Sequence, residues 1–320
     1  MNRLLILASI LWLGLGLIFS CSSFSERRSQ VESAPLISQQ LTDQTGRLIS
    51  LPDRPRRVVS LAPNITEIIF AIGAADKLVA RSQACDYPSE ALQVAEVITY
   101  PELDLEQLKA LNPDLIVTTD EIFGPADIEL LEKLKLPVYL QQYDSLPDVY
   151  RGIRELGEIL QVAESANHLA DSLESLEKRI IDSTDAQVHY RTTILISNDP
   201  LMVVGGKGYL NQLIQKAGGL NVYQDLPQPY PHTSVEQLLQ LQTEYLILPS
   251  KRQNTYSELL SQYPALHNTP ADVYKQVHLI DPDLVYRPGP RMLQGLLELT
   301  HILHSKLNPQ IFTDEVEATP

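Results

Sequence analysis

The sequence predicts an α/β protein with two lobes joined by one long helix, and three observations support this prediction. The chain has 320 residues, more than a single hydrophobic core usually fills. Residues 104–120, DLEQLKALNPDLIVTTD, are repeated in outline by residues 234–250, SVEQLLQLQTEYLILPS. The segment between these two copies carries apolar residues at helical spacing over a long distance. Together they predict two Rossmann-like α/β lobes joined by a single long, rigid helix.

The composition is globular and acidic. Hydrophobic residues make up 44% of the chain and charged residues 20%, with a formal net charge of −15 at pH 7. This charge argues against a nucleic-acid-binding protein, because phosphates require a basic surface. Charge alone names no small ligand, since a basic pocket can lie within an acidic surface.

The N-terminal segment has the layout of a secretory signal followed by a lipid-attachment site. Residues 1–20 hold one arginine, an apolar run and then small residues. Cys21 follows directly, and IFSC resembles a bacterial lipobox, in which the cysteine is lipidated and becomes the new N-terminus. Residues 21–40 are polar and rich in Ser and Gln, as in a flexible tether. We expect an exported protein, in the periplasm or at the cell surface and anchored through Cys21; an uncleaved membrane anchor is the alternative.

The other cysteine of the chain is Cys85. With Cys21 lipidated, no intrachain disulfide can form, so the fold must depend on its core. We expect Cys85 to be a semi-buried free thiol, with a contact to ligand as the alternative.

Residues 41–144 are predicted to form the N-terminal lobe. A loosely alternating stretch with a turn at Gly46 predicts a β-hairpin at its start. RRVVSLAP is typical of a strand, and NITEIIFAIG of a helix that Asn64 or Thr66 caps and Gly73 ends. KLVAR then begins another strand.

Residues 187–310 show the same order of elements and are predicted to form the C-terminal lobe, followed by a tail at 311–320. TTILISNDP is typical of a strand, residues 209–217 of a helix, and Gly218-Gly219 of its end. Alternating strands and helices imply a mostly parallel sheet covered by helices in each lobe.

Residues 145–186 are predicted to connect the lobes through helices, of which one is long. From residue 162 to 184 the helical pattern contains no Gly or Pro. At about 1.5 Å per residue this helix spans roughly 30 Å, enough to cross from one lobe to the other. Because a helix resists bending better than a glycine-rich linker, we expect the lobes to move little relative to one another.

The repeated segments place one glutamate in the same slot of each lobe, Glu106 and Glu236. Asp104 and Ser234 are good N-caps, and a glutamine three residues after each completes a capping-box pattern. Each glutamate then lies in the first helical turn, where the helix dipole favours a carboxylate. Helix stability alone explains such residues, but in lobes related by a pseudo-twofold axis they would also form a matched pair for a symmetric partner.

Several motifs, taken in their order and spacing, resemble a known family. RRVVSLAPNITEIIFAIG, ACDYP, LDLEQLKALNPDLIV, the long central helix, SVEQL and RPGPR follow one another over roughly residues 50–305. The chain resembles the substrate-binding proteins of cobalamin and iron-siderophore ABC importers. This resemblance implies an extracytoplasmic protein that captures a metal chelate in a cleft between its lobes and delivers it to an ABC permease dimer. Glu106 and Glu236 match the family's surface glutamates, which form salt bridges to arginines of the permease.

The resemblance also implies which residues line the cleft, where strand ends and loops of both lobes converge. Tyr100 and Tyr230 each precede a docking glutamate by six residues and would flank a flat macrocycle. Asp283 and Arg287 match ligand-contacting positions through RPGPR. The expected ligand-binding set is Pro63, Asn64, Tyr87, Tyr100, Tyr230, Asp283 and Arg287.

A corrinoid is the favoured ligand, and a ferric siderophore is the alternative. An anionic ferric chelate would need several cations in the cleft, for which Arg81, Arg287, Arg291 and Lys207 are candidates. Where the best-known cobalamin binder has a third aromatic residue before its DYP turn, this chain has Ala84.

An enzyme or an adhesin on the same scaffold is the more remote alternative. VVGGKGYL resembles a glycine-rich phosphate loop, but Lys207 is followed by Gly208 rather than by the Ser or Thr that holds magnesium. Neither G-x-S-x-G nor H-E-x-x-H occurs in the chain. We expect no catalytic residue, no metal site, no resident cofactor and no nucleic-acid partner, and a monomeric protein.

Overall fold

The computed structural model describes residues 38–184 and 189–304. The signal peptide at 1–20, the lipidation site Cys21, most of the tether and the tail at 311–320 lie outside the described residues, so those expectations stay predictions. Within the described ranges, no helix combines the length and the apolar character needed to cross a bilayer.

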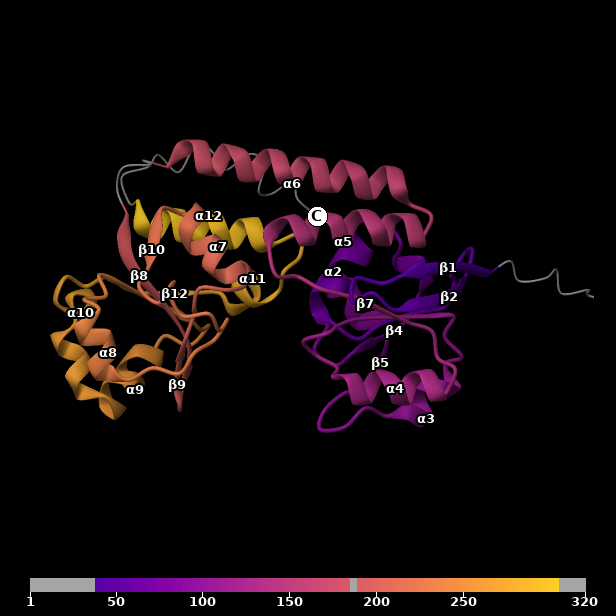
Figure 1. The fold of residues 1–320 in the computed structure, drawn as a ribbon, viewed down its shortest axis with the longest axis horizontal. Helices are drawn as coiled ribbons and strands as arrows, with labels where there is room; N and C mark the ends of the chain where they lie inside the picture. Colours follow the sequence, from indigo (N-terminus) through magenta and orange to yellow (C-terminus); the bar gives the residue numbers. More distant parts are fainter. Residues whose placement is uncertain (1–37, 185–188, 305–320) are drawn as a thin grey trace, which may run out of the picture. The chain divides into compact units, whose positions relative to one another are not determined.

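The N-terminal lobe is built on a five-stranded sheet whose strands are all parallel (Figure 1). Its inner strand β6 (Leu115–Thr119) is buried along its whole length, because a parallel strand covered on both faces meets no solvent. In spatial order the other strands are β5 (Ala95–Val97), β4 (Leu78–Ser82) and β3 (Val58–Ser60) before β6, and β7 (Val138–Gln141) after it; the helices are α2 (Pro63–Ala71), α3 (Leu105–Ala110) and α4 (Pro125–Lys133), with 3-10 turns at Ala75–Lys77 and Ser89–Gln93.

The C-terminal lobe repeats the strand order of the first. β8 lies between β10 and β11 as β3 lies between β4 and β6, and β12 follows β11 as β7 follows β6. The repeat seen in the sequence is therefore a repeat of topology, and the predicted two-lobed α/β fold is confirmed. The elements are β8 (Tyr190–Asn198), β9 (Leu201–Val203, antiparallel to β8), α7 (Tyr209–Lys216), β10 (Gly219–Asn221), α8 (Val235–Gln240), β11 (Tyr245–Pro249), α9 (Thr255–Gln262), a 3-10 turn at Pro264–Asn268, α10 (Pro270–Val273), β12 (Val277–Ile280), α11 (Pro282–Tyr286) and α12 (Met292–Leu303).

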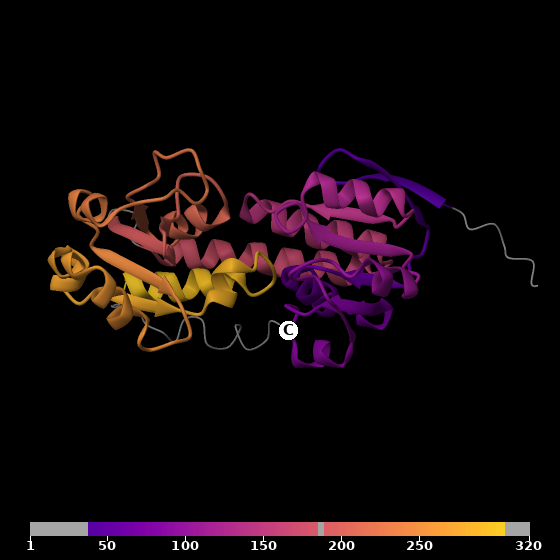
Figure 2. The ribbon, with the colours of Figure 1, turned by 90° about the horizontal axis from the view of Figure 1, so that it is seen from below.

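Two helices connect the lobes, α5 (Leu146–Ile159) and α6 (Ala163–Ser183). The long helix predicted from residue 162 to 184 is confirmed as α6, which has 21 residues. It packs against α5 along its first part and against α12 of the C-terminal lobe along its later part (Figure 1 and Figure 2).

One hydrophobic cluster runs through both lobes and the connecting helices. It includes Ile65 of α2, Leu173 of α6 and Leu296 of α12, each at most 1% exposed. Each lobe has a smaller cluster of its own besides. Since separating buried apolar surface costs about 25 cal/mol per Å², this shared core holds the lobes together in addition to the chain connection.

The predicted N-terminal hairpin is confirmed as β1 (Ser38–Thr42) and β2 (Leu48–Pro52). Gly46 has φ +86° in its turn, a conformation in which glycine carries no steric penalty. The Gln44 N–H donates to the carbonyl of Leu140 at 3.2 Å, so the turn is attached to the edge strand β7.

Helix α2 begins differently from the prediction. Its N-cap is Ala62 with Pro63 at the first helical position, where the missing N–H of proline costs nothing. Asn64 and Thr66 lie inside the helix, and their side chains bond to Pro288 and Ser60 instead. The predicted end at Gly73 is confirmed, with φ +76° there.

Helices α5 and α6 approach closely at Gly157. A Cβ built on Gly157 would lie 2.2 Å from the Cβ of Ala166 and 3.4 Å from the Cα of Ala163. Glycine inside a helix costs about 1 kcal/mol relative to alanine. The close approach explains why a glycine occupies this helical position.

We expect Gly157→Ala to lower the free energy of unfolding by about 1–2 kcal/mol, because overpacking outweighs the gain in helix propensity. Urea unfolding followed by circular dichroism measures the change. Ala166→Gly removes the opposing methyl group, so the double variant should recover the steric part of the loss and show a favourable coupling energy. A Gly157→Ala protein as stable as the parent would contradict the close helix contact.

Candidate functional site

A buried carboxylate on α2, Glu67, joins the two lobes. Its side chain is 2% exposed, and two arginines from the segment between α11 and α12 bind it. Arg291 donates from Nε to Oε2 at 2.9 Å and from Nη2 to Oε1 at 2.6 Å. Arg287 donates from Nη1 to Oε1 at 3.2 Å. The bridge therefore fixes which parts of the two lobes face each other.

Arg287 has further acidic partners. Its guanidinium lies 2.7 Å from Asp86 Oδ1 and 3.0 Å from Asp283 Oδ1. Lys251 Nζ in turn lies 2.6 Å from Asp283 Oδ2 and 3.4 Å from Asp281 Oδ1. We call this group the interlobe ion cluster; its members are Glu67, Asp86, Asp281, Asp283, Lys251, Arg287 and Arg291, so that its carboxylates outnumber its cations.

The charges of this cluster shift one another's pKa values. Burial raises the pKa of Asp86, but the hydrogen bond and the charge of Arg287 outweigh it and hold that pKa below its ordinary value. Burial lowers the pKa of Arg287, and its bonds to Asp86 and Glu67 more than compensate, so the pKa is raised. Arg287 is thus held by the protein's own carboxylates.

Most of the predicted ligand-binding residues gather at the interlobe ion cluster. The Arg291 guanidinium lies 3.8 Å above the centroid of the half-buried Tyr87 ring, a cation–π contact. Asn64 is buried and donates from Nδ2 to the carbonyl of Pro288 at 3.1 Å. The predicted residues found here are Asn64, Tyr87, Asp283 and Arg287, and Pro63 begins α2 directly before Asn64.

Tyr100 shows no hydrogen bond to a member of this cluster among the described residues, and its carbonyl accepts from Gln83 at 3.5 Å. It follows β5 at the edge of the first sheet and is 78% exposed. Its role in ligand contact stays a prediction.

Tyr230 of the second lobe is half-buried on a loop held by a glycine pair. The N–H of Gly205 donates to the carbonyl of Pro229 at 2.8 Å, and that of Gly206 to the carbonyl of Leu226 at 2.8 Å. A Cβ on either glycine would lie at most 2.1 Å from a carbonyl oxygen of the same loop. The glycines that resembled a phosphate loop therefore serve a close backbone approach that positions Tyr230.

Four side chains that act on Tyr230 or are acted on by it were not predicted from the sequence. Burial, with the charges of Glu121 and Asp144, raises the pKa of Tyr230 to about 12. Burial and Tyr230 raise the pKa of Tyr286 to about 12, and burial raises that of Tyr209, with Tyr230 and Glu121 adding to the effect. Glu121 and Asp144 follow the carboxyl ends of β6 and β7, which is the signal that could have found them.

The candidate docking glutamates lie in equivalent helices of the two lobes. Glu106 is in the first turn of α3 and Glu236 in the first turn of α8, and both are exposed. Bonds from its own backbone N–H and from Ser234 lower the pKa of Glu236. Both glutamates are therefore free to meet a partner, and their role stays a prediction.

The two helices carry the predicted N-caps but only half of the predicted capping box. Asp104 accepts from the Gln107 N–H at 2.9 Å, and Ser234 accepts from the Gln237 N–H at 3.3 Å. The Gln107 side chain donates instead to the carbonyl of Glu96 at 2.5 Å. The glutamines thus attach the helices to neighbouring segments.

Three of the four cations considered for an anionic chelate are occupied by the protein. Arg81 is buried and donates to the carbonyls of Ala91 at 2.7 Å and Ser82 at 3.0 Å. Arg287 and Arg291 belong to the interlobe ion cluster, whereas Lys207 is exposed.

Cys85 is completely buried rather than semi-buried. Its Sγ lies 3.1 Å from the Ser82 Oγ, and burial raises the pKa of the thiol. A buried protonated thiol is chemically inert, which fits a packing role.

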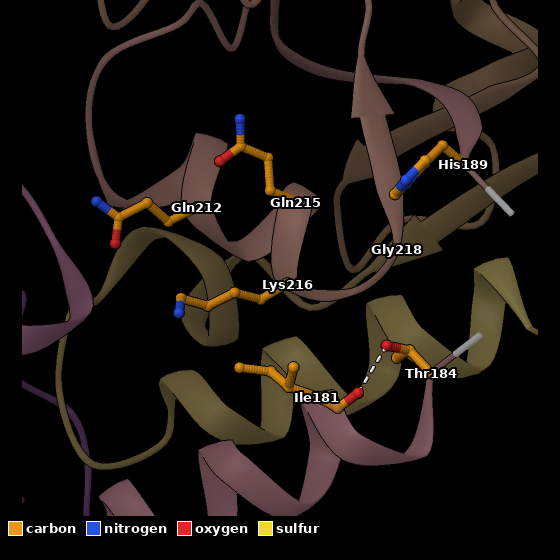
Figure 3. Close-up of a pocket in the computed structure, with 7 residues that line it drawn as sticks. All are labelled: Ile181, Thr184, His189, Gln212, Gln215, Lys216 and Gly218. Carbon is orange, nitrogen blue, oxygen red and sulfur yellow. Dashed lines mark hydrogen bonds between the residues drawn. The ribbon is translucent and has the colours of Figure 1, made fainter. Parts of the chain in front are cut away.

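Several pockets open elsewhere among the described residues, two of them beside α7 or at the amino ends of the second sheet. One, of about 440 Å³, lies where the end of α6 meets α7, with Lys216 extending over Ile181 (Figure 3). The other, of about 490 Å³, lies at the amino ends of β8 and β11, beside Tyr190 and Tyr245. Ligands of open parallel sheets bind at the carboxyl ends, so the residues around Glu67 and Tyr230 form the better candidate site.

The chain is similar to known solute-binding proteins. The profile of the periplasmic binding protein family matches residues 58–284. A vitamin B12-binding protein of Vibrio vulnificus is 30% identical over 256 residues, which cover 78% of this chain and 90% of that protein.

Solved structures show the same likeness. The periplasmic vitamin B12-binding protein BtuF of Vibrio cholerae superposes with a TM-score of 0.68 at 26% identity, covering 78% of this chain and 97% of that one. A periplasmic heme-binding protein of Pseudomonas aeruginosa gives a TM-score of 0.72 at 24% identity, covering 80% and 95%, and shows a shared fold alone.

We expect Glu67→Gln to lower the free energy of unfolding by about 3 kcal/mol, because it leaves two largely buried arginines without their shared carboxylate. The control is Glu129→Gln, which removes an exposed pair with Lys133 and should cost less than about 0.5 kcal/mol. Denaturant unfolding measures both. Equal effects of the two variants would show that the bridge does not hold the lobes.

Proposed function

The chain belongs to the periplasmic binding protein family, and we propose that it captures a metal chelate, with a corrinoid favoured, and delivers it to an ABC permease. Its role is that of a solute-binding protein, and we infer that it catalyses no reaction itself. The proposal rests on one observation above all. Residues of both lobes that follow the carboxyl ends of parallel strands converge around Glu67 and Tyr230, on a scaffold whose lobes share one core.

The chemistry around this site supports a corrinoid over an anionic ferric siderophore. A trianionic chelate would need cations that the protein leaves free, yet Arg287 and Arg291 are bound by carboxylates and Arg81 by backbone carbonyls. Tyrosines such as Tyr87 and Tyr230 offer apolar faces with polar tips, which suit a large flat macrocycle. The relatives that bind vitamin B12 support the same choice.

We further propose that Glu106 and Glu236 contact the permease. They are exposed, carry the same position in equivalent helices, and would present one carboxylate per lobe to matching arginines. Anchoring through a lipidated Cys21 would keep the protein, as a monomer outside the inner membrane, close to that partner.

The ligand proposal is tested by titration of the chain without residues 1–20. This form contains no tryptophan, since the single one is Trp12. Tyrosine emission should therefore be quenched, saturably, when cobalamin binds near Tyr87 and Tyr230. Ferric siderophores titrated side by side serve as the comparison, and stronger saturable binding of a siderophore would make the alternative ligand correct.

The docking proposal is tested by charge reversal. We expect Glu106→Arg with Glu236→Arg to leave ligand affinity within about twofold and to abolish uptake into cells, because like charges would then face the permease arginines. Glu129→Arg, a reversal on exposed α4, should support normal uptake. If the double variant loses ligand affinity instead, the two glutamates belong to the pocket.

A further inference from the structure

The acidic residues beyond β6 and β7 form a second charged group, separate from the interlobe ion cluster. Burial raises the pKa of Glu121, and the neighbouring charges of Asp120 and Asp144 raise it further. In residues 38–184 and 189–304, neither Glu121 nor Asp144 has a cation within ion-pair distance. Such like-charged carboxylates are costly unless something satisfies them.

Phenols of the C-terminal lobe face this side of the N-terminal lobe, where the Leu146 N–H, two residues after Asp144, donates to Oε1 of Gln212 on α7 at 3.2 Å. The charges of Glu121 and Asp144 raise the pKa of Tyr230, and the charge of Glu121 raises the pKa of Tyr209. Among the described residues, the charged and polar groups that shift the pKa values of Tyr209, Tyr230, Tyr286 and Glu121 are all acidic or phenolic. The five side chains therefore form one acidic and phenolic group, contributed by both lobes.

Part of this group is open to solvent. Glu121 is exposed and Tyr286 is 40% exposed, yet surrounding protein atoms desolvate both strongly enough to raise their pKa values. A ligand can therefore reach Glu121 and Tyr286 from solvent.

The buried, unpaired hydroxyl of Tyr209 is a second, independent feature of this group. Tyr209 is the first residue of α7 and is 4% exposed, and its hydroxyl has no hydrogen-bond partner among the described residues. Buried hydroxyls are rarely left unpaired, because each costs about 1–3 kcal/mol. Tyr230, Glu121 and Tyr286 act on the pKa of this phenol, so we infer that a ligand group supplies the missing hydrogen bond of its hydroxyl.

We propose that Glu121, Asp144, Tyr209, Tyr230 and Tyr286 form a subsite that accepts carboxamide groups of the ligand and rejects carboxylates. A primary carboxamide donates from its NH₂ to the carboxylates and accepts from a phenol through its oxygen, so it satisfies both kinds of group. A ligand carboxylate in the same place has no N–H to donate to Glu121 and Asp144, and its charge would be repelled by theirs. Corrinoids carry such carboxamides around the macrocycle, so the inference rests on the proposed function and names what selects the ligand.

The test compares two ligands with the same corrin ring. Dicyanocobinamide carries carboxamides, and dicyanocobyrinic acid carries carboxylates at the same positions. We expect the amide form to bind at least tenfold more tightly at pH 7.5, measured by calorimetry. In Glu121→Gln/Asp144→Asn the affinity for the carboxylate form should rise at least fivefold, while Glu129→Gln leaves the ratio unchanged. Equal affinities, or a ratio that the double variant does not alter, would overturn the subsite.

Tyr209→Phe separates a ligand-binding role from a structural one. Removal of an unpaired buried hydroxyl should leave the urea midpoint equal or higher, while affinity for dicyanocobinamide falls threefold or more. A lower midpoint with unchanged affinity would show that the hydroxyl serves the fold alone.

A second comparison separates failure of the corrinoid proposal from failure of the subsite. If neither corrinoid binds, cationic ferrioxamine B and a trianionic ferric tricatecholate are compared next. Preference for the cationic chelate would support the acidic subsite with another ligand, whereas preference for the trianion, or binding of neither, would overturn the subsite as well.

Discussion

The arrangement of the site depends on the carboxylate of Glu67 and its two arginines. A carboxylate that is almost fully buried must be paired, and Arg287 and Arg291 pair with it from the other lobe. Their binding brings the segment between α11 and α12 against α2, so that Pro288 receives the Asn64 amide and Arg291 covers Tyr87. Buried ion pairs add little net stability, but an unpaired alternative is costly, so the pairing selects one way for the lobes to face each other.

Packing supports the same geometry independently of charge. α5 and α6 contact closely because Gly157 lacks a side chain, and the cluster that contains Leu173 continues into both lobes. Gly205 and Gly206 hold the Tyr230 loop by a similar close backbone approach. A site held by a shared core and fixed loops loses little conformational entropy when a ligand binds, and affinity then depends on the match of its groups.

The charges divide the candidate site into two regions with different chemistry. Around Glu67 the cations are already bound to carboxylates, so this region offers a planar guanidinium–tyrosine surface more than free charge. Around Tyr230, among the described residues, Glu121 and Asp144 have no cation in ion-pair contact and the buried Tyr209 hydroxyl has no hydrogen-bond partner. The proposed ligand, neutral with an extended apolar face and a polar rim, suits the chemistry of both regions better than an anion would. The acidic protein as a whole adds a weak, salt-screened repulsion of the same sign.

The sequence by itself determined the features that depend on neighbours along the chain. The periodicity of residues 162–184 defined α6 to within one residue at each end, and Asp104 and Ser234 cap their helices as expected, because these signals act over a few residues. Tertiary structure decided the rest. Asn64 turned from a helix cap into a contact with Pro288, Cys85 became fully buried, and Glu121 gained its importance only beside Tyr230. Glu67 and Arg291 are 224 positions apart, and no local pattern can indicate a pair that meets only after both sheets have formed.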